Sequence, residues 1–228
     1  MWAECNVTEA KTRNIPILRR YSGGGTVYHD LGNVNYSLHR DKSLFNRTYA
    51  AEMIIKALKE HEPNLRLSPR HDIFLKEFKV SGSAYKLTRD RAYHHGTLLL
   101  STDLTKISSL LKSSLEILKA DEEFKFGGVS SVPSPVTNIP NNLSFESFLC
   151  MVEKEFQPTE PAITVKEDTV SDEIDKYTTE LSSWDWIFGK SPPFRVNLND
   201  SEFVIEAGII KKSSGNHADI GKRFCDVL

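Results

Sequence analysis

Hydrophobic and polar residues along this chain recur with two different periods. Between residues 33 and 39, Val34, Tyr36 and Leu38 alternate with polar residues, which predicts a strand. Between residues 47 and 61, the apolar positions recur at helical spacing: Ala50, Met53, Ile54, Ala57 and Leu58. This stripe predicts an amphipathic helix that covers one face of a sheet, and its residues are core residues, not part of a binding site.

The same patterns predict further elements. Short β-rich runs predict strands over residues 15–19, 72–75, 78–81 and 97–101, and residues 194–211 alternate like a pair of strands. Helical spacing predicts helices over residues 103–119, 144–156 and 171–188. Asp103 and Ser144 are suitable N-caps, and Pro192 and Pro193 follow the last helix. Turn-forming residues predict loops over residues 126–138 and 157–169.

Three consecutive glycines, Gly23, Gly24 and Gly25, follow the segment Arg-Arg-Tyr-Ser that begins at Arg19. Without side chains, the N–H groups of such a loop can touch a phosphate or a carboxylate directly. The loop is neither a Walker A loop nor a Rossmann fingerprint, because the lysine and the glycine spacing of those motifs are absent. Taken alone, a glycine run predicts a plain hairpin turn, here between the strands expected over residues 15–19 and 33–39.

Two later segments change this interpretation: Lys-Val-Ser-Gly-Ser-Ala, which begins at Lys79, and His-His-Gly-Thr-Leu, which begins at His94. With the glycine loop they resemble the signature of the lipoate-protein ligase and lipoyltransferase family. That signature is R-R-x-S-G-G-G-x-V-x-H-D-x-G-N, then K-x-S-G-x-A, then H-H-G-T-L. The resemblance runs with few gaps over residues 2–138 and resumes at residues 184–190. Three motifs in the family's order and spacing make a specific signal.

The resemblance implies an α/β (α+β) catalytic domain of the biotin and lipoate ligase type, with a mixed central sheet flanked by helices. It implies attachment of lipoate or octanoate to a lysine on the lipoyl domains of 2-oxoacid dehydrogenase E2 subunits or on the glycine-cleavage H protein. The acyl group would pass through an acyl-adenylate, made from ATP or taken up as lipoyl-AMP, and an apolar tunnel would hold its chain. The acceptor lysine must lose a proton, since its unperturbed pKa is about 10.4, and no residue here is an obvious base for that step.

Lys79 is the candidate catalytic residue. Adenylate chemistry places negative charge on a phosphoryl group, and a cation positioned there is often the largest catalytic contribution. Lys79 aligns with the family's active-site lysine, and the small residues Ser81 and Gly82 that follow leave room for a nucleotide. The ordinary alternative is a solvated strand lysine, which suits Lys76 and Lys86 better.

The glycine loop supplies the next candidates for substrate and nucleotide binding: Arg20, Ser22, Gly23, Gly24, Gly25 and His29. If Arg19 and Arg20 lie in one strand, they point to opposite faces, so that one of them faces the ligand. By resemblance this is Arg20, whereas a surface cation is a serious alternative for Arg19. Asp30 could equally cap the turn at Gly32.

Two histidines and one aspartate complete the candidate site. Adjacent histidines on a regular strand cannot both face one metal, and no third His or Cys lies at ligand spacing, which makes a structural metal improbable. By resemblance one of the pair, assigned to His95, lines the nucleotide pocket, although a hydrogen-bonded edge histidine is the ordinary alternative. Thr97 could meet a base or a ribose. Asp72 could bind Mg²⁺ or the nucleotide, although its context follows the family pattern only loosely.

Composition narrows the partners. The 228 residues are 39% hydrophobic and 26% charged, as in ordinary globular proteins. A net charge of −2 is too close to neutral to suggest nucleic-acid binding. The three cysteines indicate neither a disulfide framework nor a zinc site, and no apolar run approaches the ~20 residues of a membrane helix. We therefore expect no nucleic acid and no membrane, and we expect a monomer.

Several alternatives remain open. We expect a catalytic domain over residues 1–192, lacking N-terminal strands of the family fold, and a partial accessory domain over residues 193–228; such a chain would be poorly soluble or weakly active. The protein could be a full ATP-dependent ligase, a transferase that uses preformed lipoyl nucleotide, or a non-catalytic remnant that binds it. Biotinyl transfer is disfavoured by the motifs. The N-terminal residues and the Tyr-His-His segment resemble the eukaryotic mitochondrial lipoyltransferases most, so we expect a mitochondrial protein if eukaryotic and a cytoplasmic one otherwise.

Overall fold

A computed structural model describes residues 1–118, 134–166, 168–169, 171–215 and 217–228. The described strands form three antiparallel sheets, with orders β1-β6-β5, β2-β3-β4 and β10-β9-β8-β7. The first contains β1 (Asn33–Asp41), β5 (Ser83–Leu87) and β6 (Arg91–Leu99). The second contains β2 (Leu65–Leu67), β3 (Ile73–Leu75) and β4 (Phe78–Ser81). The third contains β7 (Glu116–Leu118), β8 (Phe194–Leu198), β9 (Ser201–Glu206) and β10 (Ile209–Ser213).

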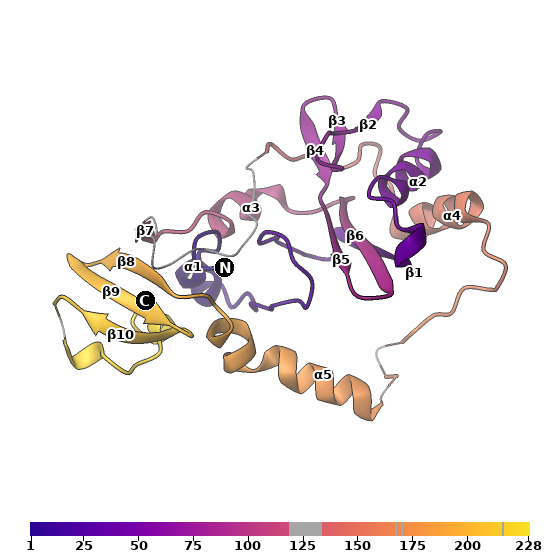
Figure 1. The fold of residues 1–228 in the computed structure, drawn as a ribbon. Coiled ribbons are helices and arrows are strands. Elements are labelled where there is room, and N and C mark those ends of the chain that lie inside the picture. Colours follow the sequence, from indigo (N-terminus) through magenta and orange to yellow (C-terminus); the bar gives the residue numbers. More distant parts are fainter. Residues whose placement is uncertain (119–133, 167, 170, 216) are drawn as a thin grey trace.

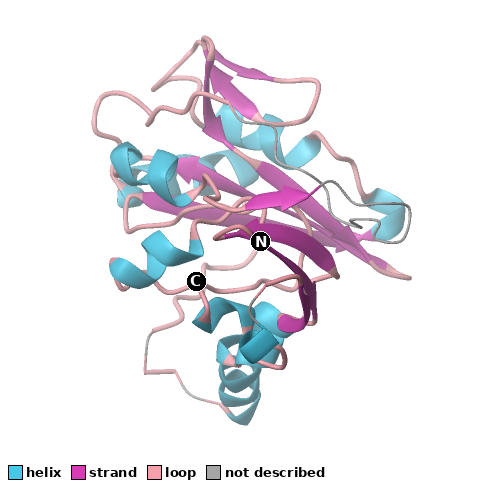
Figure 2. Ribbon diagram, turned by 90° about the vertical axis from the view of Figure 1, so that its left-hand side faces the viewer, coloured by secondary structure: helices cyan, strands magenta, loops and turns pink. Residues whose placement is uncertain are grey.

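Helices flank the strands (Figure 2). The α-helices are α1 (Val7–Thr12), α2 (Tyr49–Ala57), α3 (Leu104–Leu110), α4 (Phe145–Phe156) and α5 (Asp172–Ser182). Short 3₁₀ segments lie at η1 (Lys42–Leu44), η3 (His217–Asp219) and η4 (Phe224–Asp226), and η2 (Asp185–Gly189) is a π-helical turn. In the part of the chain that is described, no helix combines the length and the apolar character needed to cross a membrane.

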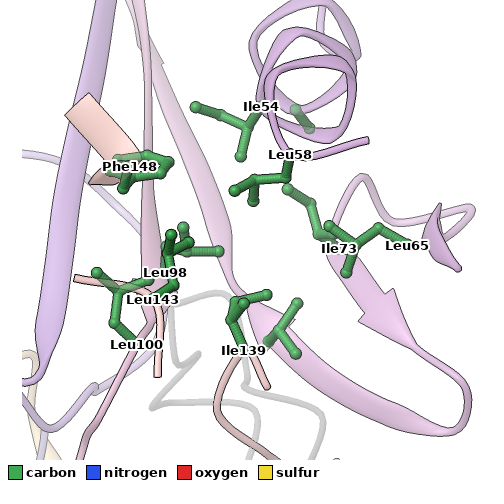
Figure 3. Close-up of a cluster of buried hydrophobic side chains, with 11 residues drawn as sticks. Ile54, Leu58, Leu65, Ile73, Leu98, Leu100, Ile139, Leu143 and Phe148 are labelled. Atoms are coloured by element: carbon green, nitrogen blue, oxygen red, sulfur yellow. The ribbon is translucent and has the colours of Figure 1, made fainter. Parts of the chain in front are cut away.

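One hydrophobic core lies between the first two sheets and helices α2 and α4. Side chains of Ile54 and Leu58 from α2 point toward Phe148 of α4 and toward Leu98 of β6 (Figure 3). Leu58, Ile73 and Leu98 are completely buried. The predicted helices over residues 47–61 and 144–156 are confirmed here, and their apolar stripes face this core, as helical spacing requires.

A second core lies under the C-terminal sheet and includes the beginning of the chain. The Trp2 ring packs against Phe188, Phe194 and Phe224, with ring centroids 5.4, 5.8 and 5.3 Å away. The Trp2 indole also donates to Ser191 Oγ at 3.0 Å. Helix α1 and the glycine loop lie between this sheet and the long strands β5 and β6 (Figure 1). Residues at both ends of the sequence thus share one core.

Two sequence predictions of secondary structure are wrong. No strand forms over residues 15–19, so the glycine loop is followed by a strand but not preceded by one. The helix expected over 103–119 ends at Leu110, and residues 116–118 pair with β8 instead. The reason lies at Ser113, whose Oγ donates to Trp2 O at 2.6 Å and accepts the N–H of Leu115 at 3.1 Å. The bond to Leu115 is local and competes with helical hydrogen bonds, and the bond to Trp2 holds Ser113 outside the helix.

Other predicted elements were placed correctly but with the wrong extent. The strand expected over 97–101 begins at Arg91, residues 194–211 contain three strands, and α5 ends at Ser182, before the turn η2. The loop expected over 157–169 has no helix or strand in its described residues. Of the loop expected over 126–138, residues 126–133 lie outside the described residues, and Val136 forms a parallel bridge with Lys79.

Candidate functional site

Pairing in the first sheet separates the two adjacent histidines. His95 is registered with Ser37 of β1 and Ala84 of β5, whereas His94 is registered with Leu38 and Tyr85. Because neighbouring residues of a strand point to opposite faces, His94 and His95 face opposite sides of the sheet. His94 is 1% exposed and faces the core, so His95 is the histidine that can meet a ligand on the other face.

The glycine loop lies against β5 on the His95 face of the sheet. A Cβ at Gly24 would lie 3.2 Å from the Ala84 Cβ, so the first motif touches the second directly. Gly24 has φ +103°, a conformation that residues with side chains rarely adopt, whereas a Cβ at Gly23 would meet nothing within 4 Å. Lys86 Nζ donates to the Tyr21 carbonyl at 3.4 Å, farther along β5. Of the three glycines, Gly24 is the one that the loop conformation requires.

Arg20 holds the glycine loop in shape. Its Nη2 donates to the carbonyls of Gly23 at 2.8 Å and Gly25 at 3.0 Å, and its Nε donates to Gly23 at 3.2 Å. The guanidinium thus lies inside the loop and brings a positive charge to the surface where the loop N–H groups could meet an anion. Burial, and then the charge of Arg20, lower the pKa of His95, which favours a neutral imidazole at neutral pH.

Lys79 forms an ion pair with Asp72, with 2.9 Å between Nζ and Oδ2. The other oxygen of Asp72 accepts the N–H of Ser83 at 3.1 Å, which fixes the carboxylate at the start of β5. The Lys79 backbone is held as well, since its N–H donates to Pro135 O at 2.8 Å and its carbonyl accepts the N–H of Thr137 at 3.1 Å. These contacts hold the Lys79 side chain and its backbone in place.

Gly82 leaves the space that the Lys79 side chain occupies. A Cβ at Gly82 would lie 3.2 Å from Lys79 Cε and 3.3 Å from Nζ. The Gly82 N–H donates to Thr97 Oγ1 at 3.0 Å, and the Thr97 N–H donates to the Gly82 carbonyl at 3.0 Å. The predicted residues Lys79, Gly82, Asp72 and Thr97 are thus brought together around one short turn between β4 and β5.

Ser81 is placed differently from the other candidates. It is 1% exposed, and its Oγ lies 3.3 Å from the hydroxyl of Tyr36, on the core side of the sheet. The Tyr36 ring occupies the space above Gly96, where a Cβ would approach the Tyr36 hydroxyl to 2.3 Å. Ser81 therefore packs on the core side of the turn, and its side chain is not accessible to a nucleotide.

Asp30 ties the exit of the glycine loop to the rest of the domain. One carboxylate oxygen accepts the N–H of Gly32 at 2.9 Å, which confirms the turn-capping alternative, and the other accepts the N–H of Asp103 at 2.8 Å, before α3. His29, just before it, is exposed, and Ser22 is half-buried. Asp30 therefore has a structural role, because both of its oxygens accept backbone N–H groups, whereas His29 is accessible to a ligand.

A contact that the sequence did not indicate holds the loop from its other side. Arg19 Nε donates to the Ile187 carbonyl at 2.9 Å, and its Nη2 donates to Ser191 Oγ at 3.1 Å. The Trp186 indole in turn donates to the Arg19 carbonyl at 2.7 Å, and its ring centroid lies 4.8 Å from that of Tyr21. Arg19 is therefore not a free surface cation; it fastens the loop to the segment before β8.

Near Lys79, one carboxylate, that of Asp72, could serve as a metal ligand. Mg²⁺ is usually held by one or two carboxylates together with substrate phosphates. At this turn Asp72 supplies one carboxylate, and it is engaged by Lys79. Within the described ranges, no group of three or more His, Cys, Asp or Glu side chains is arranged to hold a metal.

Comparison with known proteins places these motifs in context. The model of the lipoyl protein ligase A/B catalytic domain matches residues 1–157. The putative lipoate-protein ligase A of Saccharomyces cerevisiae strain S288c is 38% identical over 235 residues, covering 98% of this chain and 56% of that protein. Human mitochondrial lipoyl amidotransferase LIPT1 is 36% identical over 210 residues, covering 87% of this chain and 55% of that protein. The chain thus spans about half the length of the curated relatives that it matches.

Solved structures agree with this comparison. The crystal structure of P. falciparum LipL1 in complex with lipoate has a TM-score of 0.67 and 27% identity, covering 93% of this chain and 65% of that one. A lipoate-protein ligase A structure with bound ATP has a TM-score of 0.57 at 22% identity, covering 80% of this chain and 76% of that one, and supports the fold alone. The α+β fold of the lipoate ligase type expected from the sequence is confirmed.

Proposed function

The chain belongs to the lipoyl protein ligase A/B catalytic-domain family, and on this premise we propose that it transfers a lipoyl or octanoyl group from an acyl-adenylate to a lysine of a lipoyl domain. One observation carries the proposal. The glycine loop, which Arg20 holds through hydrogen bonds, lies next to Ala84. The Lys79 ammonium group lies next to Gly82, and Gly82 precedes Ala84 by two residues. The glycine loop, which we propose binds the phosphate, and the Lys79 ammonium group thus lie near each other on one sheet.

In the proposed reaction the amine nitrogen of the acceptor lysine attacks the acyl carbonyl carbon. A C–N bond forms, the bond from that carbon to the phosphate oxygen breaks, and AMP leaves with the electron pair while the amine proton passes to water. Negative charge grows on the leaving phosphate, and Lys79 is the cation that stabilises it there. Binding of the phosphate replaces Asp72 as the partner of Lys79, so the ion pair holds the ammonium group in its orientation until substrate arrives.

The loop and the sheet position the adenylate. The N–H groups of residues 22–25 supply donors for the phosphate, and Arg20 adds charge without leaving its loop carbonyls. His95 and Thr97 lie on the face of β6 that adjoins the glycine loop, where a neutral imidazole and a hydroxyl suit the base and ribose of a nucleotide. If Mg²⁺ takes part, Asp72 is the carboxylate that would hold it together with the phosphates.

The source of the adenylate distinguishes a transferase from a full ligase. Relatives of both names are similar to this chain, and our proposal favours the transferase. The protein should lipoylate an acceptor domain from preformed lipoyl-AMP or lipoyl-GMP and should do so poorly from lipoate, ATP and Mg²⁺. Pyrophosphate release at a rate equal to acyl transfer in the second mixture would instead make it a ligase. An acceptor domain whose target lysine is replaced by arginine is the matched control.

Names and titles of relatives support a proposal for the acceptor and the compartment. A solved archaeal lipoylation system comprises a bipartite ligase and its E2 lipoyl domain from Thermoplasma acidophilum, and the human relative is mitochondrial. We propose E2 lipoyl domains or the H protein as acceptors, and mitochondria as the compartment in a eukaryote. Intact-mass measurement of an unmodified lipoyl domain after incubation with lipoyl-AMP tests the acceptor directly.

A further inference from the structure

One end of the first sheet carries a concentration of positive charge. We call residues 40–47 and 86–91 the basic end. Its charged side chains comprise six cations, Arg40, Lys42, Arg47, Lys86, Arg89 and Arg91, and two carboxylates, Asp41 and Asp90. The whole chain has a net charge of −2, so the basic end departs strongly from the average of the molecule. A local field of this sign attracts an anionic partner.

The two segments of the basic end form one surface. The Lys42 N–H donates to the Asp90 carbonyl at 3.0 Å, and Arg91 pairs with Asp41 at 2.8 Å between Nη1 and Oδ1. The turn between β5 and β6 is closed by the Thr88 hydroxyl, which donates to the Arg91 carbonyl at 2.9 Å and accepts the Arg91 N–H at 3.1 Å. The cations are therefore presented by a rigid hairpin end and not by separate tails.

Within the described residues, most of these cations have no ion-pair partner. Of the six cations, Arg91 alone forms an ion pair with another described residue, Asp41. The Arg47 guanidinium lies 5.2 Å from the centroid of the Tyr85 ring and that of Arg40 lies 4.6 Å from the centroid of the Tyr49 ring, so aromatic faces hold them in place. Stacking on a ring leaves the edge N–H groups of a guanidinium able to bind a carboxylate.

Two exposed leucines give this surface an apolar part. Leu44 is 58% exposed and Leu87 is 46% exposed, and both belong to the segments that carry the cations. Apolar side chains beside unpaired cations are typical of a protein interface that has an apolar centre and a charged rim. A nucleic acid would gain from the cations but not from the leucines, and Asp41 and Asp90 would repel its phosphates.

The basic end adjoins the candidate site. Lys86 Nζ donates to the Tyr21 carbonyl, at the entrance to the glycine loop, at 3.4 Å. Strand β5 runs from Ser83, beside the Lys79 turn, to Leu87 in the basic end, four steps that span about 13 Å at ~3.3 Å per residue. A globular domain of about 100 residues has a radius of gyration near ~13 Å, so a domain seated on the basic end also covers the glycine loop.

We propose that the basic end is the docking surface for the acceptor domain, and that this domain presents carboxylates and an apolar patch around its target lysine. The inference rests on the proposed function for the identity of the acceptor. Docking there places the acceptor lysine over the glycine loop while the carboxylates bind Arg47 and Arg89 at the rim. Acceptor choice then depends on charge at a surface outside the adenylate pocket.

The test compares the variant Arg47→Glu/Arg89→Glu with the control Lys211→Glu/Lys212→Glu, whose exposed lysines lie on β10. Binding of an unmodified E2 lipoyl domain is measured by calorimetry at low and at high salt, and lipoyl-AMP binding is measured alongside. We expect the first variant to weaken acceptor binding about tenfold or more at low salt, with a smaller difference at high salt and unchanged lipoyl-AMP affinity. The control should bind like the wild type.

The outcomes separate the two proposals. Equal acceptor binding by all three proteins, or no acceptor binding by the wild type, would overturn the docking surface. Wild-type acceptor binding that depends on Arg47 and Arg89, without acyl transfer, would support docking while removing the proposed function. An RNA oligonucleotide that binds more tightly than the acceptor and competes with it for the basic end would assign the surface to nucleic acid. The single variant Arg89→Glu, altered only in the exposed hairpin turn, repeats the test if the double variant unfolds.

Discussion

The indole Nε1 of Trp186 donates a 2.7 Å hydrogen bond to the backbone carbonyl of Arg19, across 167 positions of sequence. This contact replaces the strand partner that residues 15–19 lack and fixes the entrance to the glycine loop. Arg19 returns the contact through the Ile187 carbonyl and Ser191 Oγ, and Ser191 Oγ also accepts the indole N–H of Trp2. The core under the C-terminal sheet is thereby connected to the candidate site.

Replacing Trp186 by Phe tests this connection. The ring contact with Tyr21 is largely kept, whereas one hydrogen bond, with a net contribution of about 1 kcal/mol, is lost. We expect roughly fivefold weaker lipoyl-AMP binding by calorimetry. The control Trp184→Phe removes the indole bond to Cys225 Sγ, which lies in the core under the C-terminal sheet and not at the glycine loop, and should leave the affinity unchanged. Equal effects of both substitutions would show that the Trp186 bond does not position the loop.

The glycine loop offers its own matched pair of variants. Gly24→Ala forces a side chain onto φ +103° and against Arg20 Nη2, whereas Gly23→Ala enters open space. Strain of this kind costs about 1–3 kcal/mol, so Gly24→Ala should weaken lipoyl-AMP binding roughly tenfold while Gly23→Ala changes it little. If the two variants bind alike, the run is a plain turn without a role in binding.

The glycine of the His-His-Gly-Thr-Leu motif has a packing role. Gly96→Ala would bring a Cβ within 2.3 Å of Tyr36 ring atoms, and overpacking of a buried site costs about 1–3 kcal/mol. We expect a lower midpoint in urea denaturation. Tyr36→Leu combined with Gly96→Ala should recover part of the loss, because the clash is removed. Additive losses in the double variant would contradict this account of the glycine.

His94 makes stability depend on acidity. Burial first, and then the neighbouring histidines, lower its pKa to about 4. The unfolded chain takes up a proton near its ordinary pKa of about 6.5, whereas the folded protein does not until about 4, so stability from this residue is present above pH ~6.5 and lost as the pH falls toward 4. Urea denaturation between pH 7 and 5 should show a smaller loss of unfolding free energy in His94→Leu than in the wild type. Equal losses of unfolding free energy in the variant and the wild type would show that His94 does not contribute to the pH dependence of stability.

The elements that the sequence predicted correctly are those that local periodicity determines. The alternation around Tyr36 predicted β1, whose inner face is half-buried, and the stripe that includes Ile54 predicted α2, whose inner face is buried. The predictions failed where a distant partner decides. Ser113 breaks the helix after Leu110 by bonding to Trp2, and Arg19 finds its partner in Trp186; neither relation leaves a periodic signal.

The sequence likewise predicted one part of the candidate site and could not indicate another. The motifs indicated that the glycine loop and the Lys79 segment belong together, and the structure places Gly24 against Ala84. The sequence left the role of Asp72 open between Mg²⁺ and nucleotide, and could not indicate its ion pair with Lys79, which depends on the fold of β3 and β4. Their roles in binding and catalysis stay predictions until variants are assayed.

The central claim is that Lys79 stabilises charge on the phosphate during acyl transfer. The most direct measurement is the single-turnover rate of lipoyl transfer from preformed lipoyl-AMP to an unmodified lipoyl domain, compared between the wild type, Lys79→Ala and the control Lys212→Ala. Circular dichroism shows whether each variant is folded. We expect Lys79→Ala to lose about 100-fold or more in rate, as for removal of one aimed electrostatic group, and Lys212→Ala to match the wild type. A folded Lys79→Ala protein that transfers the acyl group at the wild-type rate would contradict the account.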